Sequence, residues 1–114
     1  AEVNTVGREH VNRFGQFVRQ LKERKDTKGR SLLDTTAILY GSGMGNANTH
    51  NNSNLPVLVT GGSFRHGSHH AIKRNNSSGS APLLGDLFLT LMQSMGLEEN
   101  RFVNASRNLN ELLL

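Results

Sequence analysis

A glycine- and asparagine-rich segment separates two short apolar runs and carries the polar side chains best suited to chemistry. They are Ser42, Asn46, Asn48 and His50. Imidazole is a common ligand of zinc and other transition metals and transfers protons near neutral pH, so His50 is the sharpest candidate. Ser42 lies among glycines that allow sharp turns, where exposed backbone N–H groups can hold an anion. The spacing therefore indicates a metal or anion site in this loop.

The same loop also has a plainer interpretation. His50 can be a loop histidine that is hydrogen-bonded to the backbone, and residues 41–45 can be a tight turn between a strand and a loop. The glycines lie directly on both sides of Ser42, which is not the G-x-S-x-G pattern of a nucleophile elbow. The Lys-Ser/Thr ending of a P-loop is also missing. Both interpretations stay open from the sequence alone.

A second group of imidazoles follows the second apolar run. His66, His69 and His70 lie close together in the sequence, with Arg65 and Lys73 nearby. Histidine-rich tracts can bind metal, and catalytic zinc sites commonly use three protein ligands. No carboxylate lies within the group, so the alternative is an exposed basic loop that contacts an anion or nothing. We therefore consider it an anion or metal cluster.

The elements that position these residues follow from the spacing of apolar side chains. Residues 3–25 are predicted to form a helix, because one stripe has apolar spacings of three and four. The stripe consists of Gly7, Val11, Phe14, Val18 and Leu21. Residues 35–40 and 55–60 are predicted strands, and a second helix runs from Pro82 to about Met95, with Gly96 as its stop signal. Residues 98–114 give no clear pattern.

These elements predict an α/β fold with short buried strands flanked by amphipathic helices. Both strands look buried on both faces, so further strands are expected beside them. Open α/β sheets bind ligands at the carboxyl ends of their strands, where the loop of residues 41–54 would lie. Residues 1–114 are therefore either a single domain or the C-terminal piece of a larger α/β domain. The partner would be the N-terminal remainder of the same protein or another subunit.

Composition limits the classes of function. The 114 residues carry a formal net charge of +4. The sequence contains no cysteine, which excludes disulfides and thiolate zinc sites. The basic cluster of residues 19–30 contains no aromatic residue, which argues against nucleic-acid binding. No apolar run approaches the ~20 residues that span a bilayer, so no transmembrane segment is expected. Carboxylates are too few for this chain alone to build a two-metal hydrolase site.

A family resemblance rests on residues 32–62, LLDTTAILYGSGMGNANTHNNSNLPVLVTGG, together with NRFGQFVRQLK before them and PLLGDLFLTLMQSMGL after them. This pattern resembles the C-terminal part of a bacterial family of unknown function that is named for a His-x-x-Ser-His-His motif. The family motif lies upstream of the segments that match. The local sequence from His66 to His70 is one residue shorter than that motif and is not equated with it.

A more distant resemblance is to the alkaline phosphatase superfamily, which includes sulfatases and cofactor-independent phosphoglycerate mutases. His50 before the Asn-Leu-Pro-Val of residues 54–57 is similar to a histidine that binds metal in that superfamily. Asp86, Thr90 and Gly96 are similar to positions of a later helix. The Asp-His pair of the superfamily is replaced within residues 41–43. The resemblance implies the C-terminal piece of a three-layer sandwich, in a secreted or periplasmic protein.

Two hypotheses of different class follow. In the first, the protein acts on phosphate or sulfate esters: His50 binds a divalent metal or a small anionic substrate, Asn46 and Asn48 orient ester oxygens, and Ser42 lines the pocket. The nucleophile and most metal ligands would come from the remainder. In the second, the protein is a non-catalytic, ligand-binding or extracellular assembly protein with a degenerate metal site. A weaker third possibility is anion or nucleic-acid binding through residues 65–74.

Overall fold

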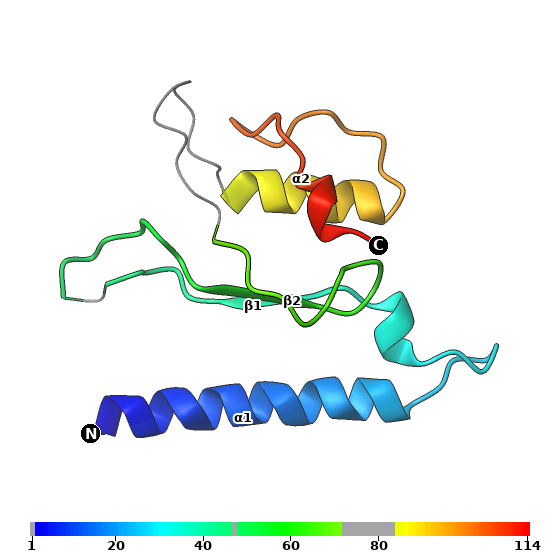
Figure 1. Ribbon diagram of the computed structural model, residues 1–114, viewed down its shortest axis with the longest axis horizontal. Helices are drawn as coiled ribbons and strands as arrows, with labels where there is room; N and C mark the ends of the chain where they lie inside the picture. Colours follow the sequence, from blue (N-terminus) through cyan, green and yellow to red (C-terminus); the bar gives the residue numbers. More distant parts are fainter. Residues whose placement is uncertain (1, 47, 72–83) are drawn as a thin grey trace. The chain divides into compact units, whose positions relative to one another are not determined.

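The computed structural model describes residues 2–46, 48–71 and 84–114 as a small mixed α/β protein (Figure 1). Its elements are α1 (Glu2–Glu23), a 3-10 turn η1 (Leu32–Thr35), β1 (Ile38–Gly41), β2 (Val57–Thr60), α2 (Leu84–Ser94) and a 3-10 turn η2 (Asn110–Leu112). The chain divides into two compact units, unit 1 (Ala1–Gly62) and unit 2 (Ser63–Leu114). None of the described helices is both long and apolar enough to cross a lipid bilayer.

Helix α1 confirms the predicted helix, but only three of the five residues in the predicted stripe are partly buried. Phe14, Val18 and Leu21 are half-buried, whereas Val11 is 50% exposed. The ring of Phe14 stacks on that of Tyr40 in β1, with centroids 4.7 Å apart. The C-terminal half of α1 is therefore the part that holds the helix against the rest of unit 1.

The turn after α1 is a polar clasp built around Ser31 and Asp26. The Ser31 hydroxyl lies 3.2 and 2.9 Å from the carbonyl oxygens of Leu21 and Lys22, which need partners at the helix end. The same Oγ accepts a hydrogen bond from the Leu33 N–H and caps η1. Asp26 accepts hydrogen bonds from the backbone of Lys28 and Arg30. Residues 32–35 form η1, so the first strand begins at Ile38 and not at Thr35, where the sequence predicts it.

Strands β1 and β2 form a two-stranded antiparallel sheet, with Ile38 opposite Thr60 and Gly41 opposite Val57. The prediction of strands buried on both faces is wrong, because no residue of either strand is buried. Leu39 and Leu58 are 37% and 48% exposed. The physical reason is that two strands with α1 on one face leave both edges and part of each face uncovered.

Unit 2 encloses a small core around α2. Its buried apolar side chains are Phe64, Leu87, Leu89, Ala105 and Leu109. The hydroxyl of Thr90, which is fully buried, donates to the carbonyl oxygen of Asp86 and accepts from the Leu109 N–H, both at 2.8 Å. This hydroxyl fixes the otherwise irregular C-terminal segment on α2.

Helix α2 ends where the sequence predicts. Gly96 has a φ of +85°, and the Leu97 N–H donates to the carbonyl oxygen of Met92 at 3.1 Å. The Gly96 N–H donates to the carbonyl oxygen of Gln93 at 3.0 Å, which completes a Schellman motif. The predicted first turn at Pro82 lies outside the described residues. After Gly96 the chain returns along α2 and pairs Leu113 with Phe64.

Candidate functional site

The loop of residues 42–56 joins β1 directly to β2 at one end of the sheet (Figure 1). Because the strands are antiparallel, the carboxyl end of β1 meets the amino end of β2 there. The carboxyl end of β2 lies at the opposite end of the sheet. A crevice shared by the carboxyl ends of both strands, as in parallel sheets, is therefore not formed by these two strands.

Ser42 makes a local turn at the base of this loop. Its Oγ donates to the carbonyl oxygen of Met44 at 2.8 Å and accepts from the Met44 N–H at 3.2 Å. The Ser42 N–H donates to the carbonyl oxygen of Pro56 at 3.3 Å, which continues the strand pairing. These contacts agree with the plainer interpretation of residues 41–45 as a tight turn. The contact of Ser42 with a substrate stays a prediction.

Asn46 organises the tip of the loop. Its Oδ1 accepts hydrogen bonds from the backbone N–H groups of Asn48 and Thr49, at 3.0 and 3.4 Å. Asn46 also pairs with Asn51 through their backbones, and Asn51 Oδ1 accepts from the Ser53 N–H at 2.7 Å. Sequence reasoning did not single out Asn51. The signal was the tendency of Asn to bond a backbone N–H two residues on.

His50 and Asn48 are the predicted site residues whose side chains this network leaves unused. Both are exposed, and neither side chain has a hydrogen bond to another described residue. His50 has a φ of +49°, a left-handed conformation in which histidine is enriched. The loop backbone is thus fixed by Ser42, Asn46 and Asn51, while the imidazole of His50 remains available to a ligand.

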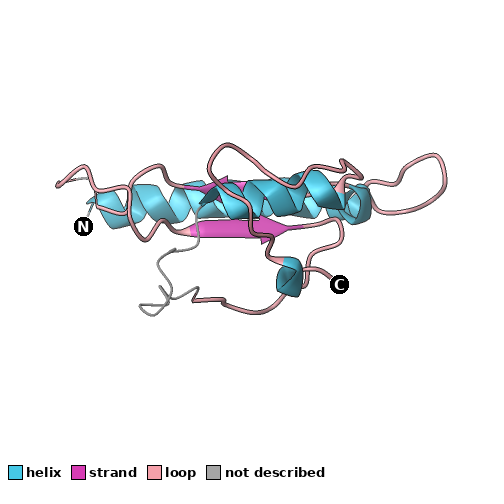
Figure 2. Ribbon diagram, turned by 90° about the horizontal axis from the view of Figure 1, so that it is seen from above, coloured by secondary structure: helices cyan, strands magenta, loops and turns pink. Residues whose placement is uncertain are grey.

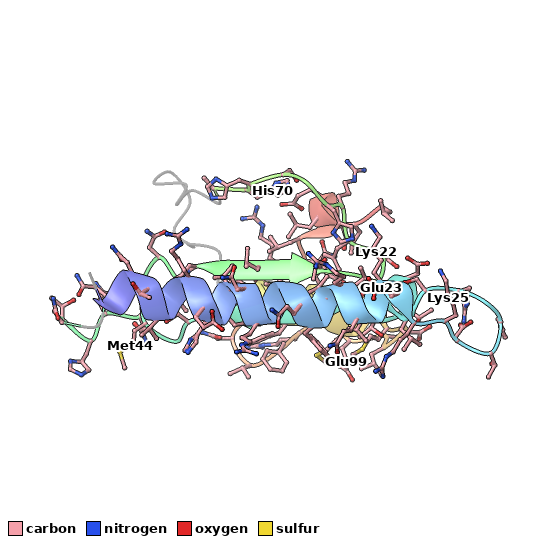
Figure 3. All side chains as sticks on the ribbon, turned by 90° about the horizontal axis from the view of Figure 1, so that it is seen from below. Lys22, Glu23, Lys25, Met44, His70 and Glu99 are labelled. Atoms are coloured by element: carbon pink, nitrogen blue, oxygen red, sulfur yellow. The ribbon has the colours of Figure 1, made fainter. Side chains whose placement is uncertain are left out.

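The second histidine group lies on an irregular segment of unit 2 that bends at Gly67, where φ is +80°. His66, His69 and His70 are all exposed, and His70 Nε2 is 2.8 Å from the hydroxyl of Ser68. Figure 3 labels His70 on this segment. Arg65 is engaged elsewhere, because its Nε donates to the carbonyl oxygen of Leu113 at 2.6 Å. Lys73 and Arg74, which were expected to join this group, lie outside the described residues.

The part of the chain that the structure describes provides no complete set of metal ligands. Within residues 2–46, 48–71 and 84–114, no three His, Cys, Asp or Glu side chains come close enough to hold an ion together. Metal binding at His50, or at the anion or metal cluster, would therefore use ligands from outside these residues. Both sites remain predictions.

The structure adds one feature that sequence reasoning missed. An open depression runs along the N-terminal half of α1 and is lined by Asn4, Gly7, Arg8, Val11 and Asn12. The space above Gly7 is open, since a β-carbon at this position would meet no atom within 4 Å. All the described lining residues belong to one helix, so these residues alone do not enclose a ligand.

The comparisons with known proteins add no relative: no protein-family model, no curated protein and no solved structure matches this chain. The resemblances given by the sequence therefore remain expectations.

Proposed function

We propose that this protein is a ligand-binding or assembly component in which further polypeptide completes the sheet of unit 1. One observation carries the proposal: residues 4–46 and 48–62 bury no large apolar side chain. A two-stranded sheet is marginally stable in water, and independent stability needs more strands or a well-packed helix. The apolar side chains of unit 1 that are about half exposed are Val6, Val11, Phe17, Met44 and Leu58.

The superfamily resemblance suggests what the further polypeptide is. If the chain is the C-terminal piece of an alkaline-phosphatase-like sandwich, the N-terminal remainder of that protein, or another subunit, provides the missing strands. In that arrangement α1 covers one face of a larger sheet, and the loop of residues 42–56 lies at one end of it. Secretion or a periplasmic location is part of the same proposal.

Hydrogen exchange tests the need for a partner. In the chain by itself, we expect the amides of β1 and β2 to exchange at least a hundredfold faster than the amides of Leu89 and Thr90 in α2. The reason is that an amide exchanges without unfolding of the whole protein when its local opening costs little free energy. We expect this of the strands, because the described residues of unit 1 give them little support. Equal protection of the sheet and α2 would contradict the proposal, because unit 1 would then be stable without a partner.

Ester hydrolysis is the second candidate function, and the unused imidazole of His50 favours it. The hydrogen bonds of Ser42, Asn46 and Asn51 fix the loop backbone without involving that imidazole. A preorganised loop lowers the entropic cost of binding a ligand. In this function His50 binds a divalent metal or the substrate anion, Asn48 contacts an ester oxygen, and Ser42 and Asn46 position the loop. The partner would supply the nucleophile and remaining ligands.

Elemental analysis and an ester screen separate the two candidates. Bound zinc, manganese, calcium or iron that is lost in His50→Ala, together with hydrolysis of aryl phosphates or sulfates, supports ester hydrolysis. Thr49→Ala is the matched control, because it changes the neighbouring exposed residue without removing an imidazole. No metal and no hydrolysis in the assembled protein would leave the binding or assembly function.

A further inference from the structure

The outward edge of β1 carries backbone groups that face away from β2. The Ser42 N–H bonds to the carbonyl oxygen of Pro56, and the register continues this pairing into β1. Hydrogen-bonded and non-hydrogen-bonded pairs alternate in antiparallel sheets, so Tyr40 and Ile38 point their N–H and C=O groups inward. The same groups of Leu39 and Gly41 point outward, and those of Val57 and Val59 point outward at the other edge.

Within the described residues of unit 1, neither residue composition nor a covering element protects this edge. Residues 36–41 contain no charged residue and no proline, which are the usual protection of an exposed strand. Among the described residues, no backbone hydrogen bond outside the sheet involves Leu39 or Gly41. The side chain of Leu39 is also 37% exposed. An edge of this kind readily accepts a further strand.

The position of α1 distinguishes the β1 edge from the β2 edge. In views perpendicular to the sheet, α1 overlaps β1, while β2 lies to one side of α1 (Figures 2 and 3). Contacts agree: Phe14 stacks on Tyr40 of β1, whereas Leu58 of β2, on the same sheet face, is 48% exposed. One more strand could therefore pair with β1 on the side away from β2 and still lie over α1.

Apolar side chains lie beneath that empty position. Val6 and Phe17 share one flank of α1, next to the stripe that faces the sheet. Because α-helices are right-handed, this flank is the one that lies away from β2. Val6 is 55% exposed and Phe17 is 49% exposed. A strand added at the β1 edge would cover both side chains.

We infer that the outward edge of β1 binds an extended, uncharged segment of a partner polypeptide by strand addition. The segment hydrogen-bonds to Leu39 and Gly41 and places apolar side chains over Val6 and Phe17. This inference rests on the proposed completion of the sheet and names where it happens.

A second copy of the chain does not fit this position by antiparallel pairing. Antiparallel pairing of β1 with β1 of another copy would set the strands about 4.8 Å apart and put both α1 helices on the same face of the joined sheet. Packed helices need about 8–10 Å between their axes, so these two would overlap. The occupant we propose is a strand without a helix of its own beneath it.

A peptide probe tests the edge directly. We would add an N-acetylated, C-amidated peptide with the sequence of residues 35–42, TTAILYGS, to the 15N-labelled chain and follow amide exchange. At saturation we expect the exchange of the Leu39 and Gly41 amides to slow at least tenfold, while that of Val57 and Val59 changes less than twofold. Slowing at Val57 and Val59 instead, or at no strand amide, would overturn the inference.

Two pairs of variants locate the contact. Leu39→Pro removes an outward N–H of β1 and should weaken peptide binding at least tenfold, whereas Val59→Pro, at the opposite edge, should weaken it less than threefold. If either proline unfolds the hairpin, Phe17→Ser and Gln16→Ser decide the matter outside the sheet. The Phe17 variant should weaken binding several-fold, and the Gln16 variant should not change it; equal effects overturn the inference.

Failure here is distinguishable from failure of the proposed function. If the sheet proves as protected as α2 in the chain alone, the need for a partner is wrong. If the sheet exchanges fast but the peptide protects the β2 edge, a partner is still needed and only the β1 assignment is wrong.

Discussion

The two units of this chain use apolar residues in different ways. In unit 2, a short helix and the segment that returns along it bury Phe64, Leu87, Leu89, Ala105 and Leu109. In unit 1, a helix twice as long, of 22 residues against 11, covers only part of a two-stranded sheet, and no large apolar side chain within residues 4–46 and 48–62 is buried. The length and amphipathicity of a helix therefore do not establish a core, which requires a surface that fits against it.

The two units also differ in where their polar residues make hydrogen bonds. Unit 1 concentrates its specific hydrogen bonds at chain reversals, in the clasp around Ser31 and Asp26 and in the loop of residues 42–56. Unit 2 has its central polar contact, Thr90, inside the core. Local turns in unit 1 are thus well determined by hydrogen bonds, while its described apolar side chains stay partly exposed.

The largest expected effect comes from deleting a core side chain. Leu89→Ala should destabilise unit 2 by about 2–5 kcal/mol, because Leu89 is 1% exposed and its removal leaves a cavity. Leu39→Ala is the matched control in unit 1 and should cost less than about 1.5 kcal/mol, since Leu39 is 37% exposed. Denaturant unfolding followed by residue-resolved hydrogen exchange measures both; equal costs would contradict the contrast between the units.

Removing the buried hydroxyl of unit 2 should have the next largest effect. Thr90→Val keeps the shape but leaves the buried Leu109 N–H without its acceptor, which should cost about 1–3 kcal/mol. Thr90→Ser retains the hydroxyl and should retain the protection of the Leu109 amide. The comparison fails if the two variants expose that amide to the same degree.

Two glycine substitutions should change stability in opposite directions. Gly96→Ala forces a φ of +85° on an L-residue and should destabilise unit 2 by about 1–2 kcal/mol. Gly15→Ala lies within α1, where a β-carbon meets nothing within 4 Å, and should stabilise the helix by about 0.5–1 kcal/mol. Thermal unfolding monitored by circular dichroism gives both signs. A destabilising Gly15→Ala would show that α1 is more closely packed than described.

The smallest expected effect is the loss of stability of the clasp at low pH. The backbone N–H of Arg30 above all, with the Arg30 side chain and the Lys28 N–H, lowers the pKa of Asp26 below its usual range. A lowered carboxyl pKa stabilises the fold fully above the unfolded value of about 3.9, and this contribution is lost as the pH falls through the folded value.

The clasp after α1 should therefore open only as the pH falls below the ordinary titration range of a carboxyl group, and Asp26→Asn should remove the pH dependence of exchange at the Lys28 and Arg30 amides. Asp34→Asn is the control, since Asp34 is exposed and outside the clasp. An unchanged pH profile in the Asp26 variant would exclude this carboxylate as the cause.

Sequence patterns predicted the helices and their ends better than the packing. The stripe of α1 and the stop at Gly96 are local properties, and both helices and the Gly96 turn are confirmed. Burial of the strands was predicted incorrectly, because the apolar sequence of residues 57–60 is suited to a buried position that nothing in the described chain supplies. Burial depends on neighbours that a strand's own residues do not specify.

The candidate site shows the same division. The loop between the strands, and its Asn and Gly composition, were evident from the sequence. Which polar side chains serve the loop itself was not, since an Asn that caps a turn and an Asn that binds a ligand look alike before folding. The hydrogen bonds of Asn46 and Asn51 assign these two side chains to the loop itself, and among the predicted site residues they leave His50 and Asn48 with unused polar atoms.

The pairing of Ser63–Arg65 with Leu112–Leu114 has a mechanical consequence. The Leu114 N–H bonds to Ser63 and the Arg65 N–H bonds to Leu112, so the chain enters and leaves unit 2 on adjacent antiparallel segments. Force applied between these two ends loads the hydrogen bonds one after another, as in a zipper, instead of shearing them together. Under tension this unit should open at its seam at low force, before α2 and its buried hydroxyl contact yield.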